Sequence, residues 1–211
     1  MILIKNCGLK RAQEIALAAA TGASFVGLVY HPSSPRHLEL PVMAALAATI
    51  PPPVKSVVVL VNPSDATLDV ILKHFRPDYW QVHGITDAAR ITAIKEHTGI
   101  PVIAGVSVKT SEDILPAHHL ATAADSILFD TRHDTLAGGS GEAFDWSLLT
   151  GINLPVPWFL AGGLTAENVA RAIGITGAKA VDVSSGIEAR PGEKSLEKIA
   201  AFNKAVLEPR A

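Results

Sequence analysis

Eight short apolar segments alternate with helix-forming segments along the 211 residues of the chain. Several of the apolar segments are continuous runs rich in β-branched residues, which is typical of strands buried on both faces. Regular alternation at this spacing favours parallel strands joined by right-handed crossovers, and eight such units close a barrel. We therefore predict an α/β fold, a single (β/α)8 TIM barrel that occupies residues 1–211 as one domain. The predicted strands are 2–6, 25–30, 54–61, 79–82, 101–106, 126–129, 158–161 and 180–183.

An open, doubly wound sheet would show a similar alternation of strands and helices. Such a sheet commonly carries a G-x-G-x-x-G turn after its first strand, where it binds a dinucleotide. In this chain the first predicted strand is followed by Cys7 and Gly8, without a turn of that kind. The closed barrel is therefore the favoured architecture.

The composition limits the classes of function. The chain is 48% hydrophobic, and its formal charge of −2 is not gathered into a basic stripe, so we expect a small ligand and no nucleic acid. No segment approaches the ~20 apolar residues that a membrane span requires, and the first residues do not resemble a secretion signal. The single cysteine excludes an internal disulfide. These features predict a cytoplasmic protein with no membrane partner.

Two turns made of small residues follow the last two predicted strands. The first contains Gly162 and Gly163, and the second contains Ser185 and Gly186. Backbone N–H groups in such turns can approach a ligand closely and surround an anion. Each turn alone could be purely structural, but the pair stands where (β/α)8 barrels usually bind phosphate. We predict a phosphate site here, and a helix that begins after an N-cap at Thr165.

The residues that directly follow barrel strands form the active face, so two of them are candidate catalytic groups. Cys7 follows the first strand and precedes a helix. It could be a buried structural thiol, but a helix N-terminus would stabilise its thiolate, which could then act as a base or a nucleophile. Asp130 ends the sixth apolar segment, where it could bond the next loop or act as a general acid with a raised pKa.

Three more polar residues are candidate substrate contacts. Arg36 could hold a carboxylate through two hydrogen bonds or could be a solvated loop residue. His83 follows the fourth strand and could contact a ligand or support a neighbouring side chain. Asp182 lies within the eighth strand and could face the barrel mouth or bond a nearby loop. The sequence shows no set of metal ligands at suitable spacing and no flavin motif, so we expect no metal and no cofactor.

A set of short motifs runs in order through nearly the whole chain. They are Lys5-Asn-Cys-Gly8, Ser34-Pro-Arg36, Val61-Asn62, Gln81-Val-His-Gly84, Leu128-Phe-Asp-Thr131, residues 138–146, Ala161-Gly-Gly-Leu164 with Glu167-Asn168, and residues 181–188. Taken in this order, the motifs resemble the phosphoribosylanthranilate isomerase family of tryptophan biosynthesis, whose members are (β/α)8 barrels. Two positions depart from the family pattern: Asn6 stands where an aliphatic residue is usual, and Ala104 lies near a position often occupied by lysine.

The resemblance implies an Amadori rearrangement without a cofactor, which converts N-(5-phosphoribosyl)anthranilate into 1-(2-carboxyphenylamino)-1-deoxyribulose 5-phosphate. It implies that Asp130 is the general acid at the ribose ring oxygen and that Cys7 is the general base at the ribose C2 carbon. It also implies that Arg36 anchors the anthranilate carboxylate. The residues implied to hold the phosphate are Gly162, Gly163, Ser185 and Gly186.

Three alternatives differ in what they require of the sequence. A related phosphosugar isomerase of histidine biosynthesis resembles a duplicated half-barrel, and this chain shows no second phosphate turn in its first half. A Schiff-base aldolase needs a lysine at a strand end, whereas Lys5 and Lys55 lie within or before their strands. A barrel that only binds a phosphorylated ligand would need neither Cys7 nor Asp130. The sequence leaves open whether the protein is a monomer or a homodimer.

Overall fold

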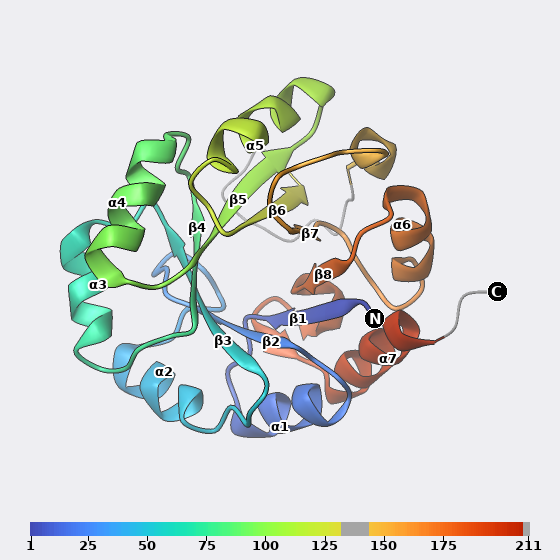
Figure 1. The fold of residues 1–211 in the computed structure, drawn as a ribbon. Helices are drawn as coiled ribbons and strands as arrows, with labels where there is room; N and C mark the ends of the chain where they lie inside the picture. The colour runs from blue at the N-terminus through green and yellow to red at the C-terminus, as the bar shows by residue number, and fades with distance from the viewer. Residues whose placement is uncertain (132–143, 209–211) are drawn as a thin grey trace.

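Eight parallel strands close into a barrel in the computed structural model, and helices surround the barrel (Figure 1). The structure describes residues 1–131 and 144–208. Neighbours in the barrel follow sequence order, and β1 closes the ring by pairing with β8. This confirms the predicted fold class and excludes the open sheet. The strands are β1 (Leu3–Cys7), β2 (Phe25–Val29), β3 (Lys55–Val61), β4 (Tyr79–His83), β5 (Val102–Val108), β6 (Ser126–Thr131), β7 (Trp158–Leu160) and β8 (Ala180–Val183).

The helices begin and end at residues suited to those positions. Ser64, Asp87 and Ser195 each accept a backbone N–H at a helix start, and Gly99 ends α4 in the left-handed conformation. The described helices are α1 (Ala12–Ala20), α2 (Leu40–Ala47), α3 (Asp65–Leu72), α4 (Ala88–Thr98), α5 (Leu115–Leu120), α6 (Val169–Thr176) and α7 (Leu196–Leu207), with short 3₁₀ turns η1 (Ser111–Ile114), η2 (Trp146–Leu149) and η3 (Ser185–Ile187). None of these helices is long and apolar enough to cross a membrane.

Alternate residues of each strand point into the barrel or outward to the helices. The barrel interior contains an apolar cluster that includes Val57, Ile103 and Leu128. A separate buried cluster joins Val59 to Cys7 at the end of β1. The inside of the barrel is therefore a filled core, and the site is expected at the carboxyl ends of the strands.

The structure corrects the predicted start of the helix after β7. Thr165 is not the N-cap, because α6 begins at Val169 and Asn168 takes the capping position. The Asn168 side chain instead reaches back, donating to the Gly163 carbonyl and accepting from the Thr165 N–H, each at 2.8 Å. Residues 165–168 are thereby held in the loop.

A small hairpin after β8 was not predicted. Its strands are β9 (Glu188–Arg190) and β10 (Glu193–Lys194), which pair antiparallel. The sixth strand also continues further than predicted, so Asp130 lies within β6. Residues 138–143 of the segment 138–146 that resembles the family lie outside the described residues.

Candidate active site

The carboxyl ends of the barrel strands bring the predicted site residues together. Cys7, His83 and Asp182 lie on β1, β4 and β8, and Asp130 lies near the end of β6. Arg36, in the loop between β2 and α2, is within electrostatic range of Cys7 and Asp130. Residues from five separate parts of the chain therefore share one end of the barrel.

Cys7 is the last residue of β1, and its side chain is 5% exposed. It faces Gly27, its register partner on β2, and a Cβ added at Gly27 would lie 2.6 Å from the Cys7 Sγ. Space for the thiol thus depends on the missing side chain of Gly27. The predicted stabilisation by a helix N-terminus is wrong, because α1 begins only at Ala12 and burial raises the pKa of the Cys7 thiol.

Lys5 is the cation that accompanies this thiol, and the sequence analysis did not assign it to the site. It lies two residues before Cys7 on the same face of β1 and is fully buried. Its Nζ is 2.9 Å from Asp182 Oδ1. Burial disfavours the ammonium, but Asp182 and Cys7 outweigh that effect and raise the pKa of Lys5. The sequence feature that could have pointed to Lys5 is the presence of a lysine inside a predicted apolar strand.

Of the two alternatives considered from the sequence for Asp182, a bond to a neighbouring loop is not the one observed. Asp182 is buried inside the barrel, opposite Lys5 in the β1–β8 register and within electrostatic range of Asp130 and His83. Its carboxylate compensates the buried ammonium of Lys5, which would be costly to desolvate alone.

His83 stands at the end of β4, where its Nε2 is 2.8 Å from the Gln81 side-chain nitrogen. The ring also packs closely against Gly105 on β5, since a Cβ there would lie 2.5 Å from His83 Nδ1. Burial, together with the charge of Lys5, lowers the pKa of His83 to about 4. The imidazole is therefore neutral near pH 7 and can donate or accept a hydrogen bond without carrying charge.

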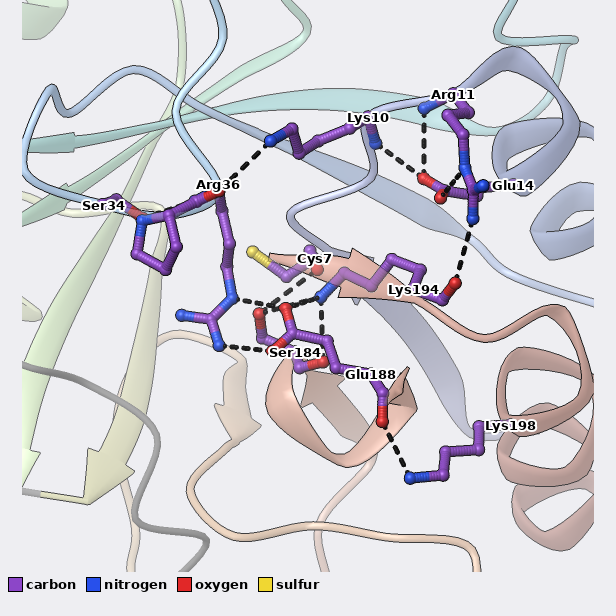
Figure 2. Close-up of polar contacts among 11 residues, drawn as sticks. Cys7, Lys10, Arg11, Glu14, Ser34, Arg36, Ser184, Glu188, Lys194 and Lys198 are labelled. Atoms are coloured by element: carbon purple, nitrogen blue, oxygen red, sulfur yellow. Dashed lines mark hydrogen bonds and ion pairs between the residues drawn. The ribbon is translucent and has the colours of Figure 1, made fainter. Parts of the chain in front are cut away.

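Arg36 is held by an acidic residue of the hairpin. Its Nε and Nη2 donate to the two carboxylate oxygens of Glu188 at 2.7 and 2.8 Å, as Figure 2 shows. Lys194 Nζ donates to the same carboxylate at 2.8 Å. Burial opposes ionisation of Glu188, yet the hydrogen bond from Arg36 and the nearby Lys194 lower its pKa. Glu188 and Lys194 were not singled out from the sequence.

Asp130 lies on the opposite side of the barrel mouth from β2 and next to the turn after β7. One of its carboxylate oxygens accepts the Thr131 N–H at 2.8 Å. Thr131 in turn abuts Gly162, where an added Cβ would lie 2.3 Å from the threonine Oγ1. The candidate acid is thus one residue from the contact between β6 and the first predicted phosphate turn.

The two predicted phosphate turns lie against each other. Gly163 adopts a φ of 63°, and a Cβ at Gly186 would lie only 1.9 Å from the Leu164 carbonyl oxygen. A cavity of about 310 Å³ lies between the turns and α7, and Lys198 adds a cation to its wall. Gly162 is not among its lining residues and instead lets the chain pass Thr131. The cavity is lined by Gly163, Leu164, Thr165, Ala166, Glu167, Ser185, Gly186, Lys198 and Ala201.

Within residues 1–131 and 144–208, no group of three or more His, Cys, Asp or Glu side chains is arranged to hold a metal ion. The polar groups of the site are instead a thiol, carboxylates, a neutral imidazole and three buried or half-buried cations. Such a set can move protons and bind a ligand with negative charge at both ends.

Comparison with known proteins finds one family along nearly the whole chain. The family model described as N-(5'phosphoribosyl)anthranilate (PRA) isomerase matches residues 4–205. A Cereibacter sphaeroides protein named N-(5'-phosphoribosyl)anthranilate isomerase is 44% identical over 204 residues, covering 95% of this chain and 96% of its own length.

Two solved structures have the same fold over nearly their whole length. Phosphoribosyl anthranilate isomerase from Thermotoga maritima superposes with a TM-score of 0.87 at 32% identity, covering 97% of this chain and 98% of its own. A structure of such an isomerase in complex with reduced 1-(o-carboxyphenylamino)-1-deoxyribulose 5-phosphate gives 0.83 at 31% identity, with the same coverage. The resemblance seen in the sequence is confirmed, and the chain belongs to the phosphoribosylanthranilate isomerase family.

Proposed function

We propose that this protein catalyses the Amadori rearrangement of N-(5-phosphoribosyl)anthranilate to 1-(2-carboxyphenylamino)-1-deoxyribulose 5-phosphate in tryptophan biosynthesis. The observation that carries the proposal is the convergence of a thiol, a carboxylate and an arginine at one end of the barrel. Cys7 and Asp130 lie on β1 and β6, and both are within electrostatic range of Arg36. Small-residue turns after β7 and β8 line a cavity. A substrate with a carboxylate at one end and a phosphate at the other would use the arginine and the turns, with the acid and base acting on its ribose.

Binding uses the two ends of the substrate. The phosphate enters the cup formed by Gly163, Ser185 and Gly186, where backbone N–H groups and the Lys198 charge favour an anion. The anthranilate carboxylate meets the guanidinium of Arg36. The ribose then lies over the strand ends, in reach of Asp182 and His83 for its hydroxyl groups.

Two proton transfers lead to an enolamine, and a tautomerisation completes the reaction. The Asp130 carboxylic acid gives its proton to the ribose ring oxygen, so that the C1–O bond breaks and a Schiff base forms. The Cys7 thiolate then takes the proton from C2, and the electron pair of that bond moves toward the Schiff-base nitrogen to give an enolamine. In the tautomerisation the enolamine gains a proton at C1 and loses the proton of its C2 hydroxyl, which yields the ketone product.

Lys5 supports the charged form of the base. Burial raises the pKa of the thiol, whereas the Lys5 ammonium acts in the opposite direction. Asp182 keeps Lys5 protonated, so Lys5 cannot serve as the neutral amine that a Schiff-base aldolase requires. The same contact therefore supports an isomerase over an aldolase.

Turnover of freshly prepared phosphoribosylanthranilate, followed by loss of its fluorescence, tests the proposal. Wild type is expected to be active, and Cys7→Ser and Asp130→Asn are each expected to lose ~10²–10⁴-fold in kcat. Asp69→Asn, an exposed carboxylate on α3, serves as the control and keeps wild-type activity. An inactive wild type, or a Cys7→Ser variant as fast as wild type, would overturn the mechanism.

A further inference from the structure

The β9–β10 hairpin is docked onto the loops that carry the site. Arg11, just before α1, donates from Nη2 to the Lys194 carbonyl at 3.0 Å. At the hairpin turn, Gly192 packs on the loop of Arg36 so closely that an added Cβ would lie 2.5 Å from the Pro35 carbonyl oxygen. The hairpin is therefore held from two sides, against the start of α1, where Figure 2 shows the Arg11 contact, and against the Arg36 loop.

Inside this hairpin, Glu188 is 6% exposed and Lys194 is 3% exposed. A buried carboxylate is costly unless it is paired and hydrogen-bonded. Here both of its oxygens accept from Arg36, and one also accepts from Lys194. Two cations share one carboxylate, so the cluster keeps one positive charge in excess, which favours the approach of a further anion.

The contact with Glu188 also leaves a defined part of Arg36 available. A guanidinium has a side edge, formed by Nε and one terminal nitrogen, and an end edge, formed by the two terminal nitrogens. Glu188 takes the side edge, through Nε and Nη2. The described residues give Nη1 no hydrogen bond, so the end edge can receive a second carboxylate in the same two-pronged manner.

The arm of Arg36 is confined along its length as well. Its Cδ lies over Gly8, where an added Cβ would come within 2.8 Å of it. The Lys194 ammonium that holds Glu188 also donates to the Ser184 carbonyl at 2.9 Å, and the Ser184 hydroxyl donates to the Cys7 carbonyl at 3.3 Å. One network of hydrogen bonds thus joins the Arg36 head group to the backbone of the candidate base.

We infer that Glu188 is a positioning residue, which fixes Arg36 so that its end edge receives the substrate carboxylate, with Lys194 holding Glu188 in place. The inference rests on the proposed function and names the residue that makes the carboxylate anchor rigid. Without Glu188, a long arginine side chain on a loop would sample several rotamers. Because Glu188 fixes Arg36 before the substrate binds, less side-chain entropy is lost on binding, and the ribose is aligned with the acid and base.

The test compares two substrates in wild type and Glu188→Gln. One substrate is phosphoribosylanthranilate, and the other is N-(5-phosphoribosyl)aniline, which lacks the carboxylate. For the first, Glu188→Gln is expected to raise KM, with a loss in kcat/KM on the order of 10²-fold. For the second, the variant and wild type are expected to be equal, because Arg36 has no carboxylate to meet.

Glu193→Gln is the matched control, because Glu193 lies on the same hairpin in an exposed pair with Arg190. It is expected to behave as wild type toward both substrates. If Glu188→Gln is poorly folded by circular dichroism, Glu188→Asp carries the test: it keeps the charge but withdraws the carboxylate by one methylene, and is expected to show the same selective loss. Equal losses on both substrates would overturn the inference, since they would reveal a purely structural role.

Failure of the proposed function is distinguishable from failure of this inference. If wild type turns over neither substrate, the function fails, and equilibrium binding of anthranilate and of aniline then decides the role of Glu188. Preference for anthranilate that is lost in Glu188→Gln supports positioning of Arg36. Equal preference in wild type and variant overturns it.

Discussion

Lys5 Nζ and Asp182 Oδ1 lie 2.9 Å apart inside the barrel, on strands that are neighbours only because the sheet closes. Asp182→Asn would leave the buried ammonium without its counter-charge. We expect the free energy of unfolding to fall by about 3–5 kcal/mol, measured by urea denaturation. Glu208→Gln, which removes an exposed partner of Lys204, is the comparison and should cost under about 1 kcal/mol. Equal effects of the two changes would contradict a buried ion pair.

The pH dependence of turnover follows from the environment of Cys7. Burial raises the pKa of the thiol above its ordinary value, and the proposed mechanism uses the thiolate. We therefore expect kcat/KM for phosphoribosylanthranilate to increase with pH, with its inflection above the usual thiol range. A pH profile from neutral to alkaline solution measures this. A profile that is flat, or that levels off below the ordinary thiol pKa, would argue against Cys7 as the base.

A side chain at Gly186 can be accommodated only if the turns of the proposed phosphate site move. An alanine Cβ would lie 1.9 Å from the Leu164 carbonyl oxygen, so the two turns must separate. Gly186→Ala is expected to raise KM on the order of 10²-fold and to weaken competitive inhibition by inorganic phosphate.

Gly174→Ala is the control for Gly186→Ala, because Gly174 is exposed within α6 and its added Cβ meets nothing. Alanine there should leave KM unchanged and stabilise the fold by about 0.4–1 kcal/mol. Unchanged inhibition by phosphate in Gly186→Ala would remove the turns from the phosphate site.

Protonation of His83 makes the stability of the folded protein depend on pH. Its pKa is lowered to about 4 in the folded protein, whereas an unfolded histidine titrates near 6.5. Between these values the unfolded state binds more protons, so this contribution is fully present above pH ~6.5 and is lost as pH falls toward 4. The difference is at most about 3 kcal/mol. Stability is measured by thermal unfolding between pH 7 and 4.5, and His83→Gln should lose less of it over this range than wild type. If stability falls with pH in parallel for the two proteins, His83 does not titrate in this way.

The barrel was predictable because its strands are continuous apolar runs, and each one ends where a small or polar residue follows. Cys7 and Asp130 stand at such ends, and Arg36 lies in the loop after β2, so their convergence at one end of the barrel follows from the topology. The helix after β7 was placed too early because Thr165 and Glu167 look like a helix start. The side chain of Asn168 bonds backward to the loop instead, and the sequence alone does not rank these two choices.

What the sequence could not provide are the partners of those residues. The Arg36–Glu188 contact joins residues 152 positions apart, and no local pattern encodes it. The hairpin that carries Glu188 has strands of three and two residues, too short for a periodic signal. Lys5 was passed over because lysine is rarely buried, and only the register of β1 with β8 reveals what compensates its charge.

Closure of the ring has a consequence for the order in which the protein can form. Lys5 belongs to β1, which is synthesised before the other strands of the barrel, and its counter-ion lies 177 residues later. Asn6 likewise has its side-chain partner far along the chain, since it exchanges hydrogen bonds with Asn203 in the folded protein. During synthesis the first strand must therefore keep Lys5 in water until the eighth strand arrives. Pairing of β8 with β1 therefore both buries this charge and brings the turn of Ser185 and Gly186 to the carboxyl end of the barrel, so one closure serves stability and the site together.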